Sequence, residues 1–179
     1  LETQGLRKLH GNEHDGYHEY KGAVISRIPF GHQVDRWVAD ETVKHIENYD
    51  SDAPFAIMVG LPSPHCPYDP TESYAERYEP DDMPDSIPET ADSRAIKDAL
   101  VTSNKRSWNG VDYSYFTESQ KKKVRAHYAG LVTIVDDCVG QIIAGLKSTG
   151  HFDNTVIIFT SDHGDFVGDY GFVGKDLFY

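Results

Sequence analysis

Two adjacent residues, Asp162 and His163 in the motif SDHGD, are the best candidates for metal chemistry in this 179-residue sequence. Together they offer one carboxylate and one imidazole nitrogen, a pair that can bind a divalent cation, and Gly164 allows the backbone to turn tightly beside them. Two ligands are too few for a metal site, and an Asp-His-Gly turn also ends strands without binding anything. Taken alone, the motif leaves a metal ligand pair and a structural turn both open.

Two further motifs could add positive groups to such a site. His65 lies in SPHCP, and Lys175 lies in GFVGK, shortly after His163. An imidazole and an ammonium can hold the oxygen atoms of an anion. Each residue also has an ordinary interpretation, because loop histidines bond to backbone and isolated lysines lie on the surface.

The elements around these motifs predict that they meet at one edge of a parallel sheet. The apolar run PFAIMVGLP indicates a strand buried on both faces over Phe55–Gly60. The β-branched run TVIIFT indicates a second strand over Val156–Thr160. A long helix between two strands implies a right-handed parallel crossover. Ligands gather at the carboxyl ends of such strands, where His65 and Asp162 follow.

The clearest predicted helix runs from Thr117 to Ser148. Thr117 and Gln120 match the two positions of a capping box, and Gly150 follows as a stop. We expect the basic run Lys121–Lys123 to be a solvated face. We expect structural roles for four carboxylates. One of Asp136 and Asp137 should make a hydrogen bond while the other faces solvent. Asp165 and Asp169 should shape their loop through Asx turns.

The remaining chain has weaker patterns. A helix is expected over 34–49, with one apolar stripe formed by Val34, Trp37, Val38, Val43 and Ile46. A short helix is expected over 71–78, and 91–109 is either a long loop or a helical insertion. The first 32 residues are expected to be irregular or to form ragged strands. His10, His14 and His18 would share a helix face and could bind metal, but Gly11 and Gly16 interrupt that helix and favour a polar loop.

Composition excludes several classes of protein. The net charge of −12, from 17 Lys+Arg against 29 Asp+Glu, argues against nucleic acid or an anionic membrane surface as the main partner. The apolar runs near Ala53–Pro62 and Thr155–Thr160 are too short to span a bilayer. The two cysteines, Cys66 and Cys138, indicate neither a disulfide framework nor a zinc site. The cellular compartment cannot be read from the sequence.

Three blocks of the sequence resemble the middle of a sulfatase of the alkaline phosphatase superfamily, in the branch that also holds phosphonate monoester hydrolases and choline-sulfatase-like enzymes. They are PFAIMVGLPSPHCPYDPTESYAERYEPDDMP, HYAGLVTIVDDCVGQIIAGL and DNTVIIFTSDHGDFVGDYGFVGKDLFY. The third block is the most specific, since it combines a strand, the Asp-His-Gly turn and the Gly-Lys pair. The resemblance implies an α/β fold, an alkaline-phosphatase-like sandwich with a large mixed, mainly parallel sheet between helices.

The resemblance also implies metal-dependent hydrolysis of a small-molecule sulfate ester or a related anionic ester. Asp162 and His163 would be metal ligands, with calcium as the preferred ion and manganese or zinc as alternatives. His65 and Lys175 would be the catalytic residues that hold the ester oxygens near the leaving group. Their chemistry agrees with these roles, because attack on a sulfuryl or phosphoryl centre needs positive groups around its oxygens.

The sequence departs from the family pattern at the nucleophile. A sulfatase of this kind has a C/S-x-P-x-R motif whose Cys or Ser becomes formylglycine, and neither Cys66 in HCPYDP nor Cys138 in DDCVGQ has that context. The metal-binding Asp pair of the family's first strand is also missing. We therefore expect residues 1–179 to be a partial sulfatase catalytic domain, lacking the N-terminal nucleophile region and the C-terminal part. The formylglycine would lie outside this chain, which alone is expected to be inactive.

Two other functions remain open at this point. One is hydrolysis of phosphonate or phosphate monoesters or diesters by an enzyme of the same superfamily. The other is a non-catalytic relative that keeps the fold. A C-x-P-x-R motif upstream in the coding sequence would separate the enzymes from the non-catalytic relative.

Overall fold

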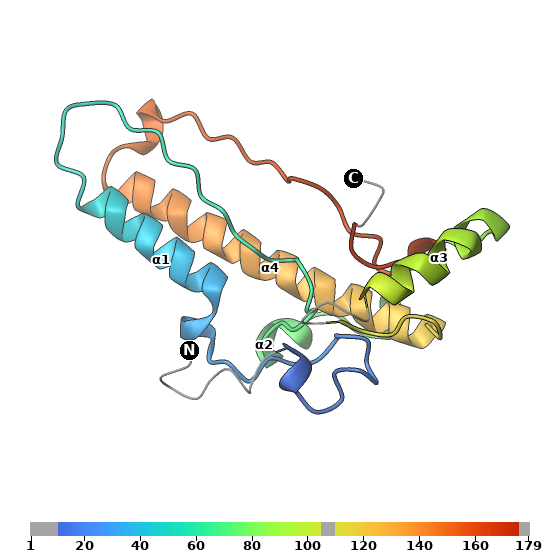
Figure 1. The fold of residues 1–179 in the computed structure, drawn as a ribbon. Coiled ribbons are helices and arrows are strands. Elements are labelled where there is room, and N and C mark those ends of the chain that lie inside the picture. Colours follow the sequence, from blue (N-terminus) through green and yellow to red (C-terminus); the bar gives the residue numbers. More distant parts are fainter. Residues whose placement is uncertain (1–10, 105–109, 176–179) are drawn as a thin grey trace.

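The computed structural model describes residues 11–104 and 110–175, in which α-helices are joined by long extended segments (Figure 1). The helices are α1 (Val34–Glu47), α2 (Glu72–Ala75), α3 (Ala91–Asn104) and α4 (Glu118–Ser148). Short 3-10 turns occupy Gly11–Glu13, Phe30–His32, Pro80–Asp82, Phe152–Asn154 and Asp169–Gly171. The predicted helices over 34–49 and 117–148 are confirmed, the one over 71–78 is shorter than predicted, and 91–104 is helical.

The long helix α4 begins and ends as its sequence predicts. Thr117 Oγ1 accepts a hydrogen bond from the Gln120 backbone N–H at 3.3 Å, and Gln120 Oε1 accepts one from the Thr117 N–H at 3.0 Å, which completes the capping box. At the other end, Gly150 has a φ of +75° and the N–H of His151 donates to the Leu146 carbonyl at 3.0 Å. Both ends are therefore specified locally.

The core lies in two clusters along α4, against which α1 and α2 pack (Figure 1). The cluster near the N-terminal half of α4 consists of Tyr17, Ala23, Val24, Tyr68, Val101, Val111, Tyr113, Phe116, Val124 and Val173. The second cluster consists of Ala39, Tyr74, Leu131, Ile134 and Cys138. Because both clusters include residues of α4, this helix holds the described segments together.

By length and composition alone, α4 is also long and apolar enough to cross a membrane, unlike the short apolar runs near 53–62 and 155–160. Its Leu131, Ile134 and Cys138 are buried against α1 and α2. A single helix of this kind is weak grounds for a membrane span, because the core helix of a globular domain has the same composition.

The predicted apolar stripe of α1 is partly wrong. Val34 and Trp37 are exposed, whereas Ala39, Ile46 and the charged Asp35 are buried. Asp35 is buried because its two carboxylate oxygens accept hydrogen bonds from the N–H and hydroxyl of Ser63, at 3.0 and 2.6 Å. A hydrophobic pattern cannot reveal a face that contains a hydrogen-bonded carboxylate.

The prediction of a solvated basic run over Lys121–Lys123 is also wrong. Lys121 is buried, and its ammonium donates to Ser86 Oγ at 3.0 Å. The ammonium of Lys123 lies 3.5 Å from the centre of the Tyr20 ring. Segments that are distant in sequence pack over the first turns of α4. A run of charged residues in the sequence does not show that other segments will bury it.

The described residues contain no β-strand, so the predicted sheet is not confirmed. The segments predicted as strands are extended but unpaired, and Met58, Val156 and Ile158 are 97%, 87% and 83% exposed. Isolated parallel bridges join Ala23 to Tyr68 and Ser26 to Thr71 instead. A strand needs a neighbouring chain to bond its N–H and C=O groups, and within the described ranges these two segments have none.

The two extended segments nevertheless run in the same direction, from the C-terminal end of α4 towards its N-terminal end (Figure 1). At their beginnings, the ring of Phe55 packs against that of His151, with centroids 5.6 Å apart. Beyond their ends, the Tyr68 hydroxyl donates to Asp165 Oδ2 at 2.9 Å. The loops that follow the two segments therefore open on one side, as the sequence predicts.

Two glycines of α4 offer a matched test of this packing. A Cβ at Gly130 would lie 3.0 Å from the Tyr74 carbonyl oxygen and 3.2 Å from Pro70, whereas a Cβ at Gly140 would meet nothing within 4 Å. Alanine is more favourable than glycine inside a helix by about 1 kcal/mol where space allows. We expect Gly140→Ala to raise the free energy of unfolding by that amount and Gly130→Ala to lower it. Urea denaturation measures both, and equal gains would show that the Pro70–Tyr74 segment does not pack on α4.

A buried histidine, His127, joins α4 to the loop that follows His65. Its Nδ1 lies 2.9 Å from the carbonyl oxygen of Tyr68. Burial lowers the pKa of His127 to about 4 from the ordinary 6.5, so the folded protein keeps the ring neutral. Between these two values the unfolded chain binds more protons than the folded one, and stability therefore falls as the pH drops.

The second prediction concerns this pH dependence. Lowering the pH from 6.5 to 4 should reduce the contribution of the neutral His127 ring to the free energy of unfolding by about 3 kcal/mol. The difference in unfolding free energy between wild type and His127→Gln should shrink by that amount over this range. Denaturation at a series of pH values measures it. The exposed His32→Gln is the control and should keep the wild-type dependence; the same profile in both variants would contradict the prediction.

Candidate active site

Three of the four predicted site residues lie together. The Lys175 ammonium is 2.7 Å from Nε2 of His163, and this Nε2 is 3.3 Å from Oδ2 of Asp162. The other oxygen of Asp162 accepts a hydrogen bond from the His163 backbone N–H at 2.9 Å. The Asp162 side chain is 83% exposed and that of His163 only 20%, so the cluster opens at the carboxylate.

The imidazole of His163 is held in one tautomer. Its Nδ1 lies 2.8 Å from the carbonyl oxygen of Gly164, which can only accept, so Nδ1 carries the proton. Nε2 then has a lone pair, and the Lys175 ammonium donates to it. Histidines that bind metals are commonly fixed in this way, with the second ring nitrogen bonded to a carbonyl.

Asp162 and His163 fit two ligands of one divalent cation. Ligands at about 2.1–2.4 Å from an ion and at right angles to each other are about 3 Å apart, and the observed separation is 3.3 Å. No third His, Cys, Asp or Glu joins them within residues 11–104 and 110–175. A complete site would need ligands from outside these ranges.

His65 does not join the cluster through a hydrogen bond. Its Nδ1 lies 2.7 Å from the carbonyl oxygen of the neighbouring Cys66, and its ring is exposed. The loop around it contains cis peptide bonds at Ser63-Pro64 and Cys66-Pro67. Because His65 makes no hydrogen bond to the cluster, the binding of one anion by both His65 and Lys175 stays a prediction.

The loop that carries Lys175 is shaped by Asp165, as the sequence predicts. Asp165 Oδ1 accepts hydrogen bonds from the N–H groups of Val167, at 2.8 Å, and Gly174, at 2.9 Å. The bond to Val167 is an Asx turn. The N–H of Phe166 donates to the Gly174 carbonyl at 3.0 Å and closes the loop beside Lys175.

Arg125 anchors the same loop on α4. Its Nε donates to the carbonyl of Val167 at 3.1 Å, and its guanidinium forms an ion pair with Asp169. Its Nη1 also donates to the carbonyls of Pro84 and Asp85, at 2.7 and 2.9 Å. Asp169 thus shapes the loop through an ion pair rather than through the predicted Asx turn.

Three supporting residues, Tyr68, Arg125 and His127, were not identified in the sequence. Tyr68 lies three positions after His65 within a proline-rich loop. A large aromatic side chain in such a loop is either exposed or packed against another part of the chain. Arg125 lies one helical turn after Lys121, a spacing that places both cations on one face of α4. These two signals were available, whereas nothing local indicates that His127 bonds to the Tyr68 carbonyl.

Of the two cysteines, Cys138 lacks the properties of an activated nucleophile. Both are free thiols, Cys66 half-buried and Cys138 buried. Burial raises the pKa of the Cys138 thiol to about 11, so it is protonated near neutral pH. The site thus contains a candidate ligand pair and candidate positive groups.

Among the described residues, the histidines of the N-terminal segment do not share the helix face that the alternative metal site requires. His10 lies outside the described residues. His14 bonds through Nδ1 to the carbonyl of Asp15, and Gly16, with a φ of +81°, turns the backbone between His14 and His18. A polar loop, rather than one helix face, accounts for these residues.

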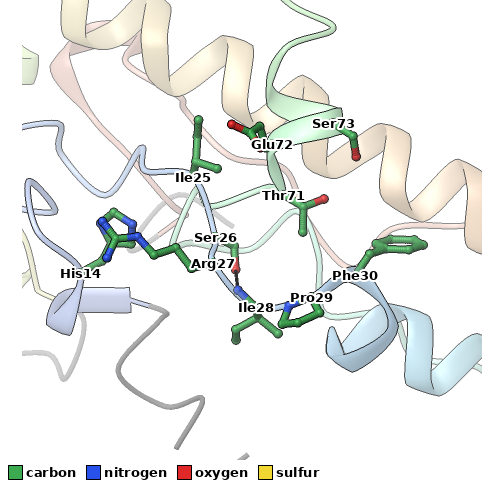
Figure 2. A pocket seen from close by; sticks show the side chains of 10 residues that line it. All are labelled: His14, Ile25, Ser26, Arg27, Ile28, Pro29, Phe30, Thr71, Glu72 and Ser73. Atoms are coloured by element: carbon green, nitrogen blue, oxygen red, sulfur yellow. Dashed lines mark hydrogen bonds between the residues drawn. The ribbon is translucent and has the colours of Figure 1, made fainter.

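A cavity of about 620 Å³ lies elsewhere, between the segment 25–30 and the first residues of α2 (Figure 2). Ile25, Ile28 and Phe30 supply apolar walls, and Arg27 and His14 lie on one side of it. None of the four predicted site residues lines this cavity. This cavity is therefore separate from the candidate site.

Comparisons with known proteins agree with the family resemblance. The family profile described as Sulfatase matches residues 4–176. The multifunctional alkaline phosphatase superfamily protein PehA of Trinickia caryophylli is 34% identical over 172 residues, covering 90% of this chain and 33% of PehA. The choline-sulfatase of Rhizobium meliloti is 33% identical over 137 residues, covering 74% of this chain and 26% of that enzyme.

A solved structure is also similar. The phosphonate monoester hydrolase of Agrobacterium radiobacter superimposes with a TM-score of 0.79 at 26% identity, covering all of this chain and 38% of that one. The present chain thus spans about a third of the length of its relatives. Its fold is of the alkaline-phosphatase-like type found in these enzymes, and the chain belongs to the sulfatase family.

Proposed function

We propose that the protein containing this chain is a metal-dependent hydrolase of small-molecule sulfate esters, and that this chain supplies part of its active site. The observation that carries the proposal is the contact between Lys175 and His163 beside Asp162, in a chain of the sulfatase family. The nucleophile would come from another part of the protein, since neither Cys66 nor Cys138 has a formylglycine context.

Asp162 and His163 would hold the divalent ion, and two features support this assignment. Their ligand atoms have the separation expected for one ion, and Nε2 of His163 has its lone pair free of a proton. Bound there, the ion would stabilise negative charge on an ester oxygen. The Asp162 carboxylate suits calcium, while the imidazole also suits manganese or zinc.

Lys175 would place a positive charge on the oxygens around the sulfur atom. Its ammonium donates to the same Nε2 lone pair that a metal ion requires. One lone pair cannot serve both groups, so metal loading would release Lys175 towards the substrate. A transition state in which these oxygens gain or redistribute charge would then be stabilised by the ammonium.

His65 would act on the leaving-group oxygen. Its Nδ1–H is directed to the Cys66 carbonyl, which leaves Nε2 as the ring nitrogen that can face a ligand. While Nδ1 keeps its proton, Nε2 can donate only when the ring is an imidazolium. A charged His65 could therefore hydrogen bond to the leaving oxygen and pass a proton to it as the bond to sulfur breaks.

A second candidate function is hydrolysis of phosphonate or phosphate esters at the same site. It is favoured by the similarity to a phosphonate monoester hydrolase over the whole of this chain. Both reactions need positive groups around a tetrahedral anionic centre, so the residue roles are unchanged. Turnover of an aryl sulfate, choline sulfate and a phosphonate monoester by the full-length protein would rank the two functions. If the full-length protein hydrolysed none of these three esters, the non-catalytic alternative would be supported.

The third prediction tests Lys175. Loss of a group that stabilises transition-state charge costs about 3 kcal/mol, or roughly a hundredfold in rate. In the full-length protein, Lys175→Ala should therefore lower kcat for the best ester about a hundredfold with little change in melting temperature. The exposed Lys44→Ala on α1 is the control and should keep wild-type turnover. Near-normal turnover by Lys175→Ala would remove this residue from the mechanism.

The fourth prediction tests the ligand pair. Asp162→Asn removes the negative charge of one proposed ligand, so we expect the purified full-length variant to retain less bound metal and to bind calcium and manganese more weakly. Elemental analysis after dialysis and calorimetric titration measure both quantities without relying on activity. Asp50→Asn changes an exposed carboxylate near the end of α1 and serves as the control. Wild-type metal content in Asp162→Asn would contradict the assignment.

A further inference from the structure

The Asp165 carboxylate is the point at which the loops of His65 and Lys175 are joined. It accepts hydrogen bonds from the Tyr68 hydroxyl at 2.9 Å and from the Gly174 N–H at 2.9 Å, one through each oxygen. Tyr68 follows His65 by three residues, and Gly174 precedes Lys175 directly. Two residues of the proposed site are thus connected through one side chain, although neither bonds to the other.

Contacts hold both the backbone and the side chain of Tyr68. Its ring is almost fully buried, its carbonyl oxygen accepts a hydrogen bond from His127 on α4, and its backbone bridges to Ala23. Burial and then the negative charge of Asp165 raise the pKa of the Tyr68 hydroxyl well above its ordinary value, so the hydroxyl keeps its proton and donates. The ring therefore acts as a rigid spacer between α4 and the loop 165–174.

We propose that Tyr68 and Asp165 are positioning residues that set the location of Lys175 relative to His65. This inference rests on the proposed function, in which both residues act on one ester. Neither positioning residue touches the substrate. Asp165 restrains Gly174, and hence Lys175, while Tyr68 fixes Asp165 to the segment that carries His65.

The consequence of breaking the link follows from geometry. A misplacement of about 1 Å at a reacting centre can cost a hundredfold in rate. Tyr68→Phe removes the hydroxyl but keeps the buried ring, so the loop 165–174 should lose its tie to the segment that carries His65 without losing its own internal bonds or its contacts with Arg125. We expect kcat to fall about tenfold to a hundredfold, with KM changed much less, because the ammonium would no longer be held where charge develops.

The chain offers a matched control at Tyr74. Like Tyr68, it is a buried tyrosine whose hydroxyl donates to an aspartate, here Asp137 Oδ2 at 2.7 Å. That contact joins α2 to α4 and does not involve the loop 165–174. Tyr74→Phe should therefore lower the melting temperature about as much as Tyr68→Phe does, while its kcat stays at the wild-type value. Equal losses of kcat in the two variants would reduce the role of Tyr68 to general stability.

The two partners should also depend on each other. Asp165→Asn keeps one oxygen that can accept from the Val167 and Gly174 N–H groups but removes the charge that Tyr68 faces. If both residues act through one contact, the double variant Tyr68→Phe/Asp165→Asn should lose no more rate than the worse single variant. Multiplied losses in the double variant would contradict a shared contact.

Hydrogen exchange in the full-length protein tests the link without relying on activity. In Tyr68→Phe, the amides of Val167 and Gly174 should exchange faster by at least about tenfold, because the carboxylate that they bond to is less restrained. In Tyr74→Phe they should exchange at the wild-type rate. Unchanged exchange in Tyr68→Phe would overturn the positioning role. If the wild type hydrolysed neither sulfate nor phosphonate esters, the proposed function would fail, and exchange alone would decide whether the link exists.

Discussion

The burial of α4 against its neighbours is the interaction on which the rest of the described structure depends. Apolar residues along the helix form both clusters of the core, and polar residues of its first half reach outward to fix the loops. His127 holds the Tyr68 carbonyl, and Arg125 holds the loop that carries Lys175. Because these contacts start from one rigid element, a shift of α4 would move both loops together rather than separate them.

The parts of the fold that were predictable from the sequence are those that neighbouring residues specify. The capping box of Thr117 and Gln120 and the stop at Gly150 define α4 within a few residues at each end. Strand pairing is not local. The runs at 55–60 and 156–160 adopt extended backbone, as their composition predicts, but hydrogen bonding requires a partner that the described residues do not provide. The packing of distant segments over a residue is equally non-local, so the basic run indicates a solvated Lys121 although the residue is buried.

The same distinction separates the site residues. Asp162 and His163 are adjacent, so a shared location follows from the sequence alone, and the closed loop 165–174 brings Lys175 back to them. His65 belongs to a distant segment, and only the parallel direction of the two extended runs predicts that its loop opens on the same side. The contact that joins these loops is made by Tyr68, a residue whose importance appears only when its burial is known.

The pairing of charges bears on the proposal that an acidic chain contributes positive groups to an active site. In a chain with a net charge of −12, several of the described cations lie beside carboxylates, and Arg125 and Lys97 are paired with Asp169 and Glu89. Lys175 differs, because the partner of its ammonium among the described residues is Nε2 of His163. A nitrogen acceptor orients an ammonium without the charge pairing that a carboxylate supplies. In the proposed function the charge of Lys175 would therefore be available for an anion, whereas Arg125 uses its charge to hold the loop in place.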